Sequence, residues 1–430
     1  MRTRHHPSRR CERSCRHLGT DPPPNAKPSN LHRVTDLTIG IVGGGQLARM
    51  MNEAATPLGL GVRLLAEAEG TSAAQVVPGA LVGDYADAST LTDFAAGTDA
   101  VTFDHEHVPT PLLQQLQDAG VAVRPGPAAL VYAQDKAAMR ERLTGLDIPA
   151  PAWRVTRTPE EFVAFGDEIG WPLIAKTSRG GYDGKGVWKV DGPDGAAEPF
   201  AALGRALGPT ERVSPGSTTG DGSATEVVIV AEEFIPFTRE MSVLVVRRPG
   251  GESVVYPVSE TVQRDGICHE TTTPAPGLDP GYAAEIQAFA TRIADELGVV
   301  GVLAVELMER PGGEVVVNEL AMRPHNTGHW TIEGAATSQF ENHLRAVLDL
   351  PLGSTAPTAP VVVMSNVLGG SNPDLVGSLP VVLADPDVRV HLYGKSVKPG
   401  RKVGHVTVRG SDVAATQDAA RAASAHLEGA

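Results

Sequence analysis

The segment from Lys176 to Gly186 combines two lysines with four glycines in its last seven residues. Short apolar runs at 172–175 and 187–190 enclose it, which predicts a strand, a loop and a second strand. Glycines let a backbone turn tightly and expose its N–H groups, and such groups beside lysines favour an anion, above all a nucleotide phosphate. A flexible solvent hairpin is the alternative interpretation. Because Lys176 ends an apolar strand, we favour the phosphate site, although no P-loop motif is present.

Two apolar segments on either side of the turn Arg310–Gly313 each carry an acid, Glu306 in the first and Glu319 in the second. A hairpin in which Glu309 faces Glu314 would place both acids on one face, a diagonal step apart. Two carboxylates on an apolar face repel each other and are costly to desolvate, and a divalent cation resolves both problems. Oxygen ligands favour Mg²⁺ shared with nucleotide phosphates.

A donor-rich stretch at 321–330 follows this hairpin and has the composition of a binding loop. Its Arg323 supplies the alternative to a metal site, because one of the two glutamates could pair with it instead. His325 and His329 could suggest zinc, but the acid of a His-Glu-x-x-His helix is missing. A proline and a glycine within the stretch also argue against a helix there.

The turn after the first apolar strand, 37–42, matches a dinucleotide-binding fingerprint through Gly43, Gly45 and Ala48. Glu67 follows the next strand, where an acid that binds ribose would stand. A milder interpretation needs only a helix N-terminus that accepts a phosphate or a carboxylate. The sequence does not separate the two, so a nicotinamide-dependent dehydrogenase stays a rival.

A basic cluster near the end of the chain contains Lys395, Arg401 and Lys402. It is either a solvated surface run or, because glycine and proline interrupt it, a shaped loop that forms a second anion site. The formal net charge of the chain is −14, which disfavours general nucleic-acid binding and requires any phosphate site to be local.

The 430 residues, 41% of them hydrophobic, suffice for two or three domains. Strands and helices alternate up to about residue 134, which is typical of a parallel α/β sheet, whereas the next region has α+β texture. We expect a disordered basic extension at 1–36, an α/β domain at 37–134, a central domain at 135–355 and a small β-rich C-terminal domain at 356–430. The stretch 208–225 is predicted to be a flexible surface loop.

No apolar run approaches the roughly 18 residues of a membrane span, and no signal-peptide core is present. Three cysteines are too few for a disulfide scaffold and fit a reducing cytosol. We therefore expect a cytoplasmic protein without a membrane partner.

Taken together, the motifs resemble the ATP-grasp superfamily and, within it, the N5-carboxyaminoimidazole ribonucleotide synthases of purine biosynthesis. The resemblance covers about residues 37–410 and is carried by segments 43–47, 180–186, 318–321, 323–329, 338–341 and 401–405. It implies a Rossmann-like pre-ATP-grasp domain, an ATP-grasp domain with a glycine-rich lid and a small C-terminal domain. The implied reaction converts 5-aminoimidazole ribonucleotide, bicarbonate and ATP into the N5-carboxy product, ADP and phosphate. Another ATP-grasp ligase, such as a formate-dependent ribonucleotide transformylase, is the alternative.

The resemblance also implies roles for individual residues. ATP would be bound by Lys136, Lys176, Gly181, Tyr182, Asp183, Gly184, Lys185, Gly186, Val187, Glu232, Glu233, Phe234, Ile235, Glu240, Gln263, Asn318 and Glu319. Mg²⁺, or Mn²⁺ in its place, would be held by Glu306, Asn318 and Glu319. The ribonucleotide would meet Gln46, Leu47, Glu106, Tyr182, Lys395, Arg401 and Lys402, and Asp183, Lys185 and Lys395 would be catalytic. The hairpin places Asn318 on the face opposite the two acids, so its ligation requires a local bulge. The resemblance further implies a homodimer.

Overall fold

The computed structural model describes residues 37–181, 185–207, 213–218, 224–264 and 266–430. The expected basic extension at 1–36 therefore lies outside the described residues, as do Tyr182, Asp183 and Gly184 of the expected lid. Within the described ranges no helix is both long enough and apolar enough to cross a membrane.

The N-terminal region is a parallel sheet in the order β3-β2-β1-β4, as the alternation of strands and helices predicts. Its strands are β1 (Thr38–Val42), β2 (Gly61–Ala66), β3 (Leu81–Val82) and β4 (Ala100–Phe103), and its helices are α1 (Gln46–Ala55), α2 (Ala88–Ala95) and α3 (Thr110–Asp118). Beyond these strands, Val123 joins the sheet only through a single bridge to Val101. In a parallel sheet the carboxyl ends of the strands meet at one edge, and the turn at Gly43, Glu67 and Asp104 all follow such ends.

A second, antiparallel sheet has the order β5-β10-β6-β7 and carries the glycine-rich segment between β6 and β7. Its strands are β5 (Trp153–Thr156), β6 (Leu173–Thr177), β7 (Val187–Val190) and β10 (Ile229–Glu233); the helices nearby in sequence are α4 (Pro127–Gln134), α5 (Lys136–Gly145), α6 (Pro159–Ile169) and α7 (Ala197–Leu207). The loop predicted at 208–225 is wrong in part, because β8 (Val213–Thr218) and β9 (Ala224–Glu226) pair as a two-stranded ribbon.

The third sheet contains nine strands in the order β16-β15-β11-β13-β14-β17-β19-β18, with β12 paired to β11. They are β11 (Arg239–Arg247), β12 (Ser253–Val255), β13 (Ser259–Arg264), β14 (Ile267–Thr273), β15 (Gly301–Glu309), β16 (Val315–Ala321), β17 (Val361–Leu368), β18 (Val388–Leu392) and β19 (Lys402–Gly410). Because β14 pairs with β17, the strands of the C-terminal region continue the sheet of the central region.

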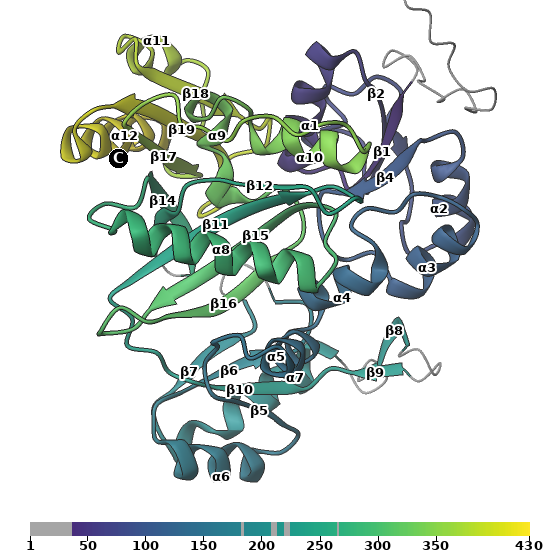
Figure 1. Ribbon diagram of the computed structural model, residues 1–430, viewed down its shortest axis with the longest axis vertical. Coiled ribbons are helices and arrows are strands. Elements are labelled where there is room, and N and C mark those ends of the chain that lie inside the picture. The colour runs from purple at the N-terminus through teal and green to yellow at the C-terminus, as the bar shows by residue number, and fades with distance from the viewer. Residues whose placement is uncertain (1–36, 182–184, 208–212, 219–223, 265) are drawn as a thin grey trace, which may run out of the picture. The chain divides into compact units, whose positions relative to one another are not determined.

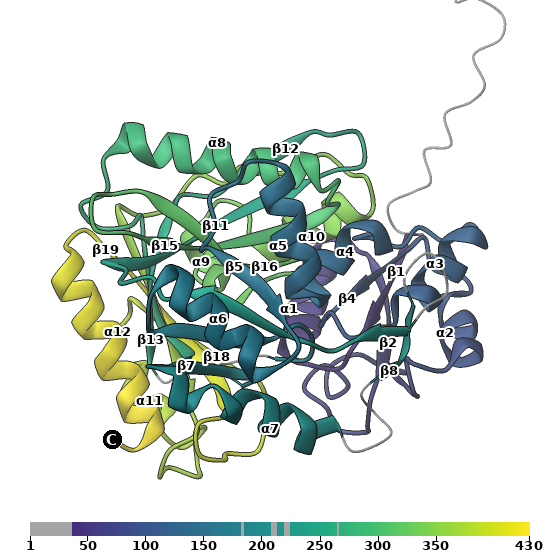
Figure 2. The ribbon, with the colours of Figure 1, turned by 90° about the horizontal axis from the view of Figure 1, so that it is seen from below.

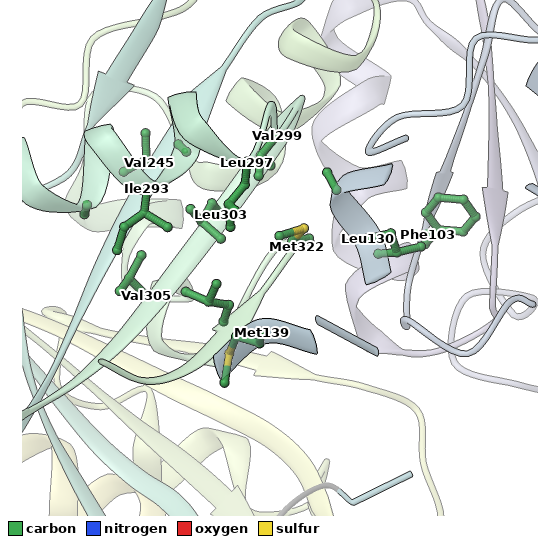
Figure 3. Close-up of a cluster of buried hydrophobic side chains, with 14 of the residues drawn as sticks. Phe103, Leu130, Met139, Val245, Ile293, Leu297, Val299, Leu303, Val305 and Met322 are labelled. Carbon is green, nitrogen blue, oxygen red and sulfur yellow. The ribbon is translucent and has the colours of Figure 1, made fainter. Parts of the chain in front are cut away.

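Alternate side chains of β11 enter two different cores, as the period of two in a strand requires. Val243 and Val245 join a core with helix α8 (Pro280–Glu296), which crosses this sheet in Figure 1. Leu244 and Val246 face the opposite side, where Trp330 is buried. The first core extends into the N-terminal region, and Figure 3 shows Met322 and Leu130 lying between the α8 side chains and Phe103.

Two further helices complete the packing around the third sheet. Helix α10 (Gln339–Val347) packs against α1 and β15, and helix α12 (Val413–Glu428) lies beside β19 in both ribbon views (Figures 1 and 2). The short helices α9 (Thr331–Gly334) and α11 (Leu379–Val382) lie in the connections. The N-terminal and third sheets are thus held by shared helices rather than by a flexible linker alone.

His343 of α10 joins the N-terminal and third sheets through hydrogen bonds at both ring nitrogens. Its Nδ1 accepts from the backbone N–H of Val302 at 3.1 Å, and its Nε2 lies 2.8 Å from Thr102 Oγ1. Because Nδ1 is an acceptor, the neutral ring carries its proton on Nε2 and donates it to Thr102. The residue is fully buried, and burial lowers its pKa to about 3.

His343→Gln is expected to weaken the pH dependence of stability on the acid side. The unfolded chain takes up the imidazole proton near pH 6.5, whereas the folded chain resists it down to about pH 3. The free energy of unfolding therefore falls as the pH decreases through this window, by at most about 1.4 kcal/mol per pH unit from this group. Urea unfolding of the variant from pH 7 to pH 4 should show a shallower fall. His426→Gln, an exposed substitution on α12, should keep the wild-type slope; equal slopes for wild type and His343→Gln would contradict the assignment.

Candidate active site

The acidic hairpin of β15 and β16 brings Glu306 directly opposite Glu319. Glu309 pairs with Val315, so the predicted pairing of Glu309 with Glu314 is wrong by one residue. The ladder then shifts between Leu307 and Glu306, because β16 contains one extra residue, Asn318. The bulge required for Asn318 is confirmed, and it places an amide and a carboxylate of β16 opposite one carboxylate of β15.

A fully buried arginine, Arg140 of α5, holds the bulge from behind. Its Nη1 and Nη2 donate to the carbonyl oxygens of Val317 and Asn318 at 2.9 and 2.8 Å. Its Nε donates to Glu232 Oε1 at 2.7 Å. The guanidinium therefore satisfies two carbonyls of an interrupted ladder and one buried carboxylate at the same time.

Lys176 reaches the same bulge from the second sheet. Its Nζ lies 3.0 Å from Asn318 Oδ1 and 2.7 Å from Glu232 Oε2. Burial by itself would raise the pKa of Glu232, but Arg140 and Lys176 outweigh burial and lower this pKa to about 2. Glu232 is therefore an anion that holds Arg140 and Lys176 in place, and it affects the site through these two cations.

The carboxylates of the hairpin carry more negative charge than the neighbouring cations compensate. Burial, and then the charges of Glu319 and Glu240, raise the pKa of Glu306 to about 8. Its Oε1 lies 3.3 Å from Nε2 of His325, and burial holds the pKa of His325 well below its ordinary value, so this ring is neutral. Glu319 contacts Lys136 Nζ at 3.1 Å.

This donor set fits a hard divalent cation. Two carboxylates and one amide oxygen are ligands that Mg²⁺ accepts, with substrate phosphates and water completing the shell. Among the described residues no group of three or more His, Cys, Asp or Glu suited to a metal ion is present. The zinc alternative finds no support, since His325 contacts Glu306 and the ring of His329 lies beside that of His405, with centroids 4.9 Å apart and planes tilted by 36°.

Arg323, the alternative partner for a glutamate of the hairpin, contacts Glu106 instead. Its Nε donates to Glu106 Oε2 at 2.8 Å. The glutamates of the hairpin have other partners, Lys136 and His325. Glu106 therefore lies beside the site but is bound by an arginine of the donor-rich loop.

Several residues expected to bind ATP lie at the end of β10, just after it, or in the later strands β11 and β13. Both carboxylate oxygens of Glu233 accept from Arg310, at 2.8 and 2.9 Å, and the ring of Phe234 lies 5.1 Å from Lys189 Nζ. Ile235 is buried, and burial raises the pKa of Glu240 on β11. Gln263 of β13 lies beside a bulge in β14, where the pairing with β13 shifts by one residue. These residues lie in or directly after strands, and their contact with a nucleotide stays a prediction.

A backbone hydrogen bond joins the two ends of the glycine-rich segment, between β6 and β7. The N–H of Thr177 donates to the carbonyl of Gly186 at 2.9 Å. A Cβ on Gly181 would lie 2.6 Å from the carbonyl oxygen of Lys185, so glycine is required at this position. Val187 begins β7 and is partly exposed.

At the dinucleotide-like turn, the N–H groups are already bound by protein carboxylates. Gly44 donates to Glu67 Oε2 at 3.0 Å, and Gly45 and Ala48 donate to the two oxygens of Asp104 at 2.7 and 2.9 Å. The hydrogen bond from His105 is the largest cause that lowers the pKa of Glu67, to about 2. Glu67 and Asp104 thus occupy the N–H groups of the glycine fingerprint that a dinucleotide pyrophosphate would need, which argues against the dinucleotide interpretation.

Gln46 and the basic cluster meet at this turn. Gln46 Oε1 accepts a hydrogen bond from Lys395 Nζ. The side chain of Leu47 is buried in the core, so only its backbone can contact a ligand. Arg401 is exposed and donates to Ser396 Oγ at 2.8 Å. The shaped loop predicted for the basic cluster is wrong at its end, because Lys402 already begins β19.

Two residues of the site were missed in the sequence. Arg140 gave no signal, since nothing distinguishes it from its neighbours in a charged helix. Asp104 could have been found, because it directly follows β4 at the edge where the strand ends converge. Lys402 was expected only near the ribonucleotide, yet its charge also acts on Glu306 and lowers its pKa. Lys402 of the basic cluster is therefore close enough to the acidic hairpin to act on its charge.

Three family models match consecutive parts of the chain. The ribonucleotide synthetase preATP-grasp domain matches residues 37–134, the ATP-grasp domain matches 141–340, and the phosphoribosylaminoimidazole carboxylase C-terminal domain matches 362–419. The sheets that carry the candidate site therefore belong to an ATP-grasp arrangement.

Curated relatives and solved structures agree with these matches. The chain is 47% identical over 384 residues to the N5-carboxyaminoimidazole ribonucleotide synthase of Mycobacterium tuberculosis, covering 87% of this chain and 84% of that protein. Identity to the Corynebacterium ammoniagenes synthase is 46% over 396 residues, covering 90% and 91% of the two chains. The Aspergillus clavatus N5-carboxyaminoimidazole synthase, solved with ADP and 5-aminoimidazole ribonucleotide, superimposes with a TM-score of 0.80 at 30% identity, covering 92% and 100%. The chain therefore belongs to the N5-carboxyaminoimidazole ribonucleotide synthase family, ATP-grasp ligases of purine biosynthesis.

Proposed function

We propose that this chain carboxylates 5-aminoimidazole ribonucleotide with bicarbonate and ATP at the site between the acidic hairpin and the turn at Gln46. The observation that carries the proposal is the bulge at Asn318. It places two carboxylates, an amide and Lys176 at one point of a hairpin whose other residues are mainly apolar. Such a set of groups is suited to a nucleotide phosphate and its cation.

Glu306, Asn318 and Glu319 would hold Mg²⁺, which would neutralise charge on the phosphates of ATP. Lys176 and Lys136 stand beside these oxygens and would bind the same phosphates, because each already contacts a carboxylate or amide of the set. The neutral His325 can donate a hydrogen bond without adding charge.

We assign the ribonucleotide to the turn at Gln46, Lys395 and Arg401. The N–H groups of Gln46 and Leu47 stand at the start of α1 between groups that carboxylates already bind. A helix start beside a lysine and an arginine is a site for a phosphate. The chain would then have two anion sites, one for each phosphorylated substrate.

The chemistry requires an activated carboxylate and an amine in one enclosed space. Phosphorylation of bicarbonate by ATP releases ADP and gives carboxyphosphate, and loss of phosphate from this intermediate delivers CO₂ to the amine of the ribonucleotide. Because carboxyphosphate is hydrolysed easily, the glycine-rich segment would exclude water. Asp183, which would orient the amine or take its proton, lies outside the described residues, and the catalytic roles of Lys185 and Lys395 are part of the proposal.

Arg401→Ala is expected to raise the KM for the ribonucleotide about tenfold or more and to leave the KM for ATP nearly unchanged. The variant loses a charge-assisted hydrogen bond to a phosphate, worth about 1.5–3 kcal/mol. Steady-state kinetics with each substrate varied in turn measure both constants. Arg409→Ala, on the same strand region but outside the cluster, is the matched control. A larger effect on ATP than on the ribonucleotide would refute the assignment of the two sites.

The overall proposal is tested by one comparison. ATP hydrolysis by the purified chain should increase when 5-aminoimidazole ribonucleotide is added with bicarbonate, and the carboxylated product should accumulate in proportion to ADP. An ATP hydrolysis rate that does not change when the ribonucleotide is added would contradict the proposal. We also propose that the chain forms a homodimer in the cytoplasm. Light scattering of the purified protein measures its oligomeric state.

A further inference from the structure

The two halves of the proposed ribonucleotide site come from opposite ends of the chain. A segment between β2 and β3, Gly70–Val77, touches both halves, and we call it the bracket. On one side the N–H of Ala73 donates to the carbonyl of Gly44 at 2.9 Å. A Cβ on Gly44 would lie only 2.3 Å from Thr71 Oγ1, so the bracket packs directly on the turn that precedes Gln46.

On its other side the bracket binds the backbone just before Lys395. Ser72 Oγ donates to the carbonyl of Tyr393 at 2.6 Å, and Gln75 Nε2 donates to the carbonyl of Gly394 at 2.8 Å. Gly394 has a φ of +65°, and a Cβ there would lie 2.1 Å from Gln75 Oε1. The left-handed conformation therefore favours glycine at this position, and the close approach shows that Gln75 packs against it.

Tyr393, two residues before Lys395, is itself held in place by several contacts. The residue is buried; its N–H donates to the carbonyl of Val403 at 2.9 Å, and its Oη lies 2.7 Å from His405 Nδ1. The Nζ of Lys395 lies 5.7 Å from the centre of the Tyr393 ring and donates to Gln46 Oε1. Hydrogen bonds to residues 393 and 394 thus fix the backbone from which the lysine side chain leaves.

We propose that Ser72 and Gln75 are positioning residues for ribonucleotide binding, which set Lys395 against the start of α1. The inference rests on the proposed function, because it takes Gln46 and Lys395 as the ribonucleotide site. Ser72 is nearly fully buried, and its own carbonyl accepts from Arg49 Nη1 of α1 at 3.2 Å, so the bracket is tied to the helix that it serves. Neither side chain needs to touch the substrate in order to act.

The test uses Ser72→Ala, Gln75→Ala and the double variant in the full chain. The KM for the ribonucleotide should rise about threefold to tenfold in each single variant and further in the double variant, while the KM for ATP stays within twofold. In a Lys395→Ala background the bracket substitutions should add little, since the group that they position is absent. Gln287→Ala is the matched control, because Gln287 Nε2 also donates to a backbone carbonyl, that of Tyr256 at 2.9 Å, from helix α8.

The possible outcomes separate the bracket from the site itself. If Lys395→Ala leaves the KM for the ribonucleotide unchanged, the proposed function of this site fails. If Lys395→Ala raises that KM but the bracket variants behave like Gln287→Ala, the positioning role is overturned. It is also overturned if the bracket substitutions raise the KM by the same factor in the Lys395→Ala background as in the wild type. Melting temperatures accompany every measurement, and Ser72→Ala, which removes a single hydroxyl, provides the test if the double variant fails to fold.

Discussion

Glu319→Gln should lower the rate of ATP turnover by about a hundredfold to a thousandfold while the fold is retained. The substitution keeps the shape of the side chain and removes one of the two charges that face each other across β15 and β16. A cation held by Glu306 and Asn318 alone would bind more weakly, and less of the negative charge on the phosphates of ATP would be neutralised. Lys136, which contacts Glu319 at 3.1 Å, would also lose its anionic partner.

Glu314→Gln is the matched control for this prediction. It makes the same chemical change at the turn of the same hairpin, where the side chain is 66% exposed and lies 3.7 Å from Arg310. Turnover is measured by ADP release at increasing Mg²⁺, and folding by circular dichroism. Glu319→Gln with wild-type turnover at saturating Mg²⁺ would refute a metal role for this hairpin, whereas Glu314→Gln should resemble the wild type throughout.

The register of this hairpin shows how far the sequence leads. Apolar runs on both sides of a glycine-containing turn predict two strands, and the period of two places both acids on one face. The sequence alone does not determine which residues pair across the turn, and the predicted register was therefore wrong by one residue. The bulge at Asn318 was expected only because the family resemblance assigned that residue to the metal.

Strands without apolar alternation escaped detection for a different reason. Strands β13 and β14 are rich in Ser, Thr, Glu and Gln, yet Thr271, Thr272 and Thr273 are buried. Their burial depends on neighbours such as β17, which arrive almost a hundred residues later in the chain. Hydroxyl groups that hydrogen-bond locally can be buried at low cost, as Ser259 and Thr273 do at 2.6 Å. A hydrophobic pattern alone therefore cannot reveal such strands.

Arg140 and Arg142 present the same limit within one helix. They stand two residues apart in α5, and their local sequence gives neither a special role. In the structure the Arg140 side chain is 0% exposed and binds Glu232 and two carbonyls of the bulge. Arg142 is 37% exposed and lies 3.8 Å from Glu296. The difference arises entirely from tertiary contacts.

Arg140→Met should therefore destabilise the chain by about 3–5 kcal/mol, the usual result of removing one partner from a buried ion pair. Glu232 would keep only Lys176, and the carbonyls of Val317 and Asn318 would lose their donors. Urea unfolding gives the loss of stability, and ATP turnover at a temperature where the variant is folded reports on the bulge. Because Lys176 would be drawn toward an under-compensated Glu232, we also expect the KM for ATP to rise.

Arg142→Met makes the same substitution half a turn away on α5, and it should change stability by less than about 1 kcal/mol, as exposed ion pairs do. Adding Glu232→Gln to Arg140→Met should recover part of the lost stability, because the buried carboxylate would no longer carry an uncompensated charge. If Arg140→Met unfolds at the same urea concentration as Arg142→Met, the buried arginine does not hold the bulge. A variant that is destabilised but keeps the wild-type KM for ATP would instead show that Arg140 stabilises the fold without shaping the site at Asn318.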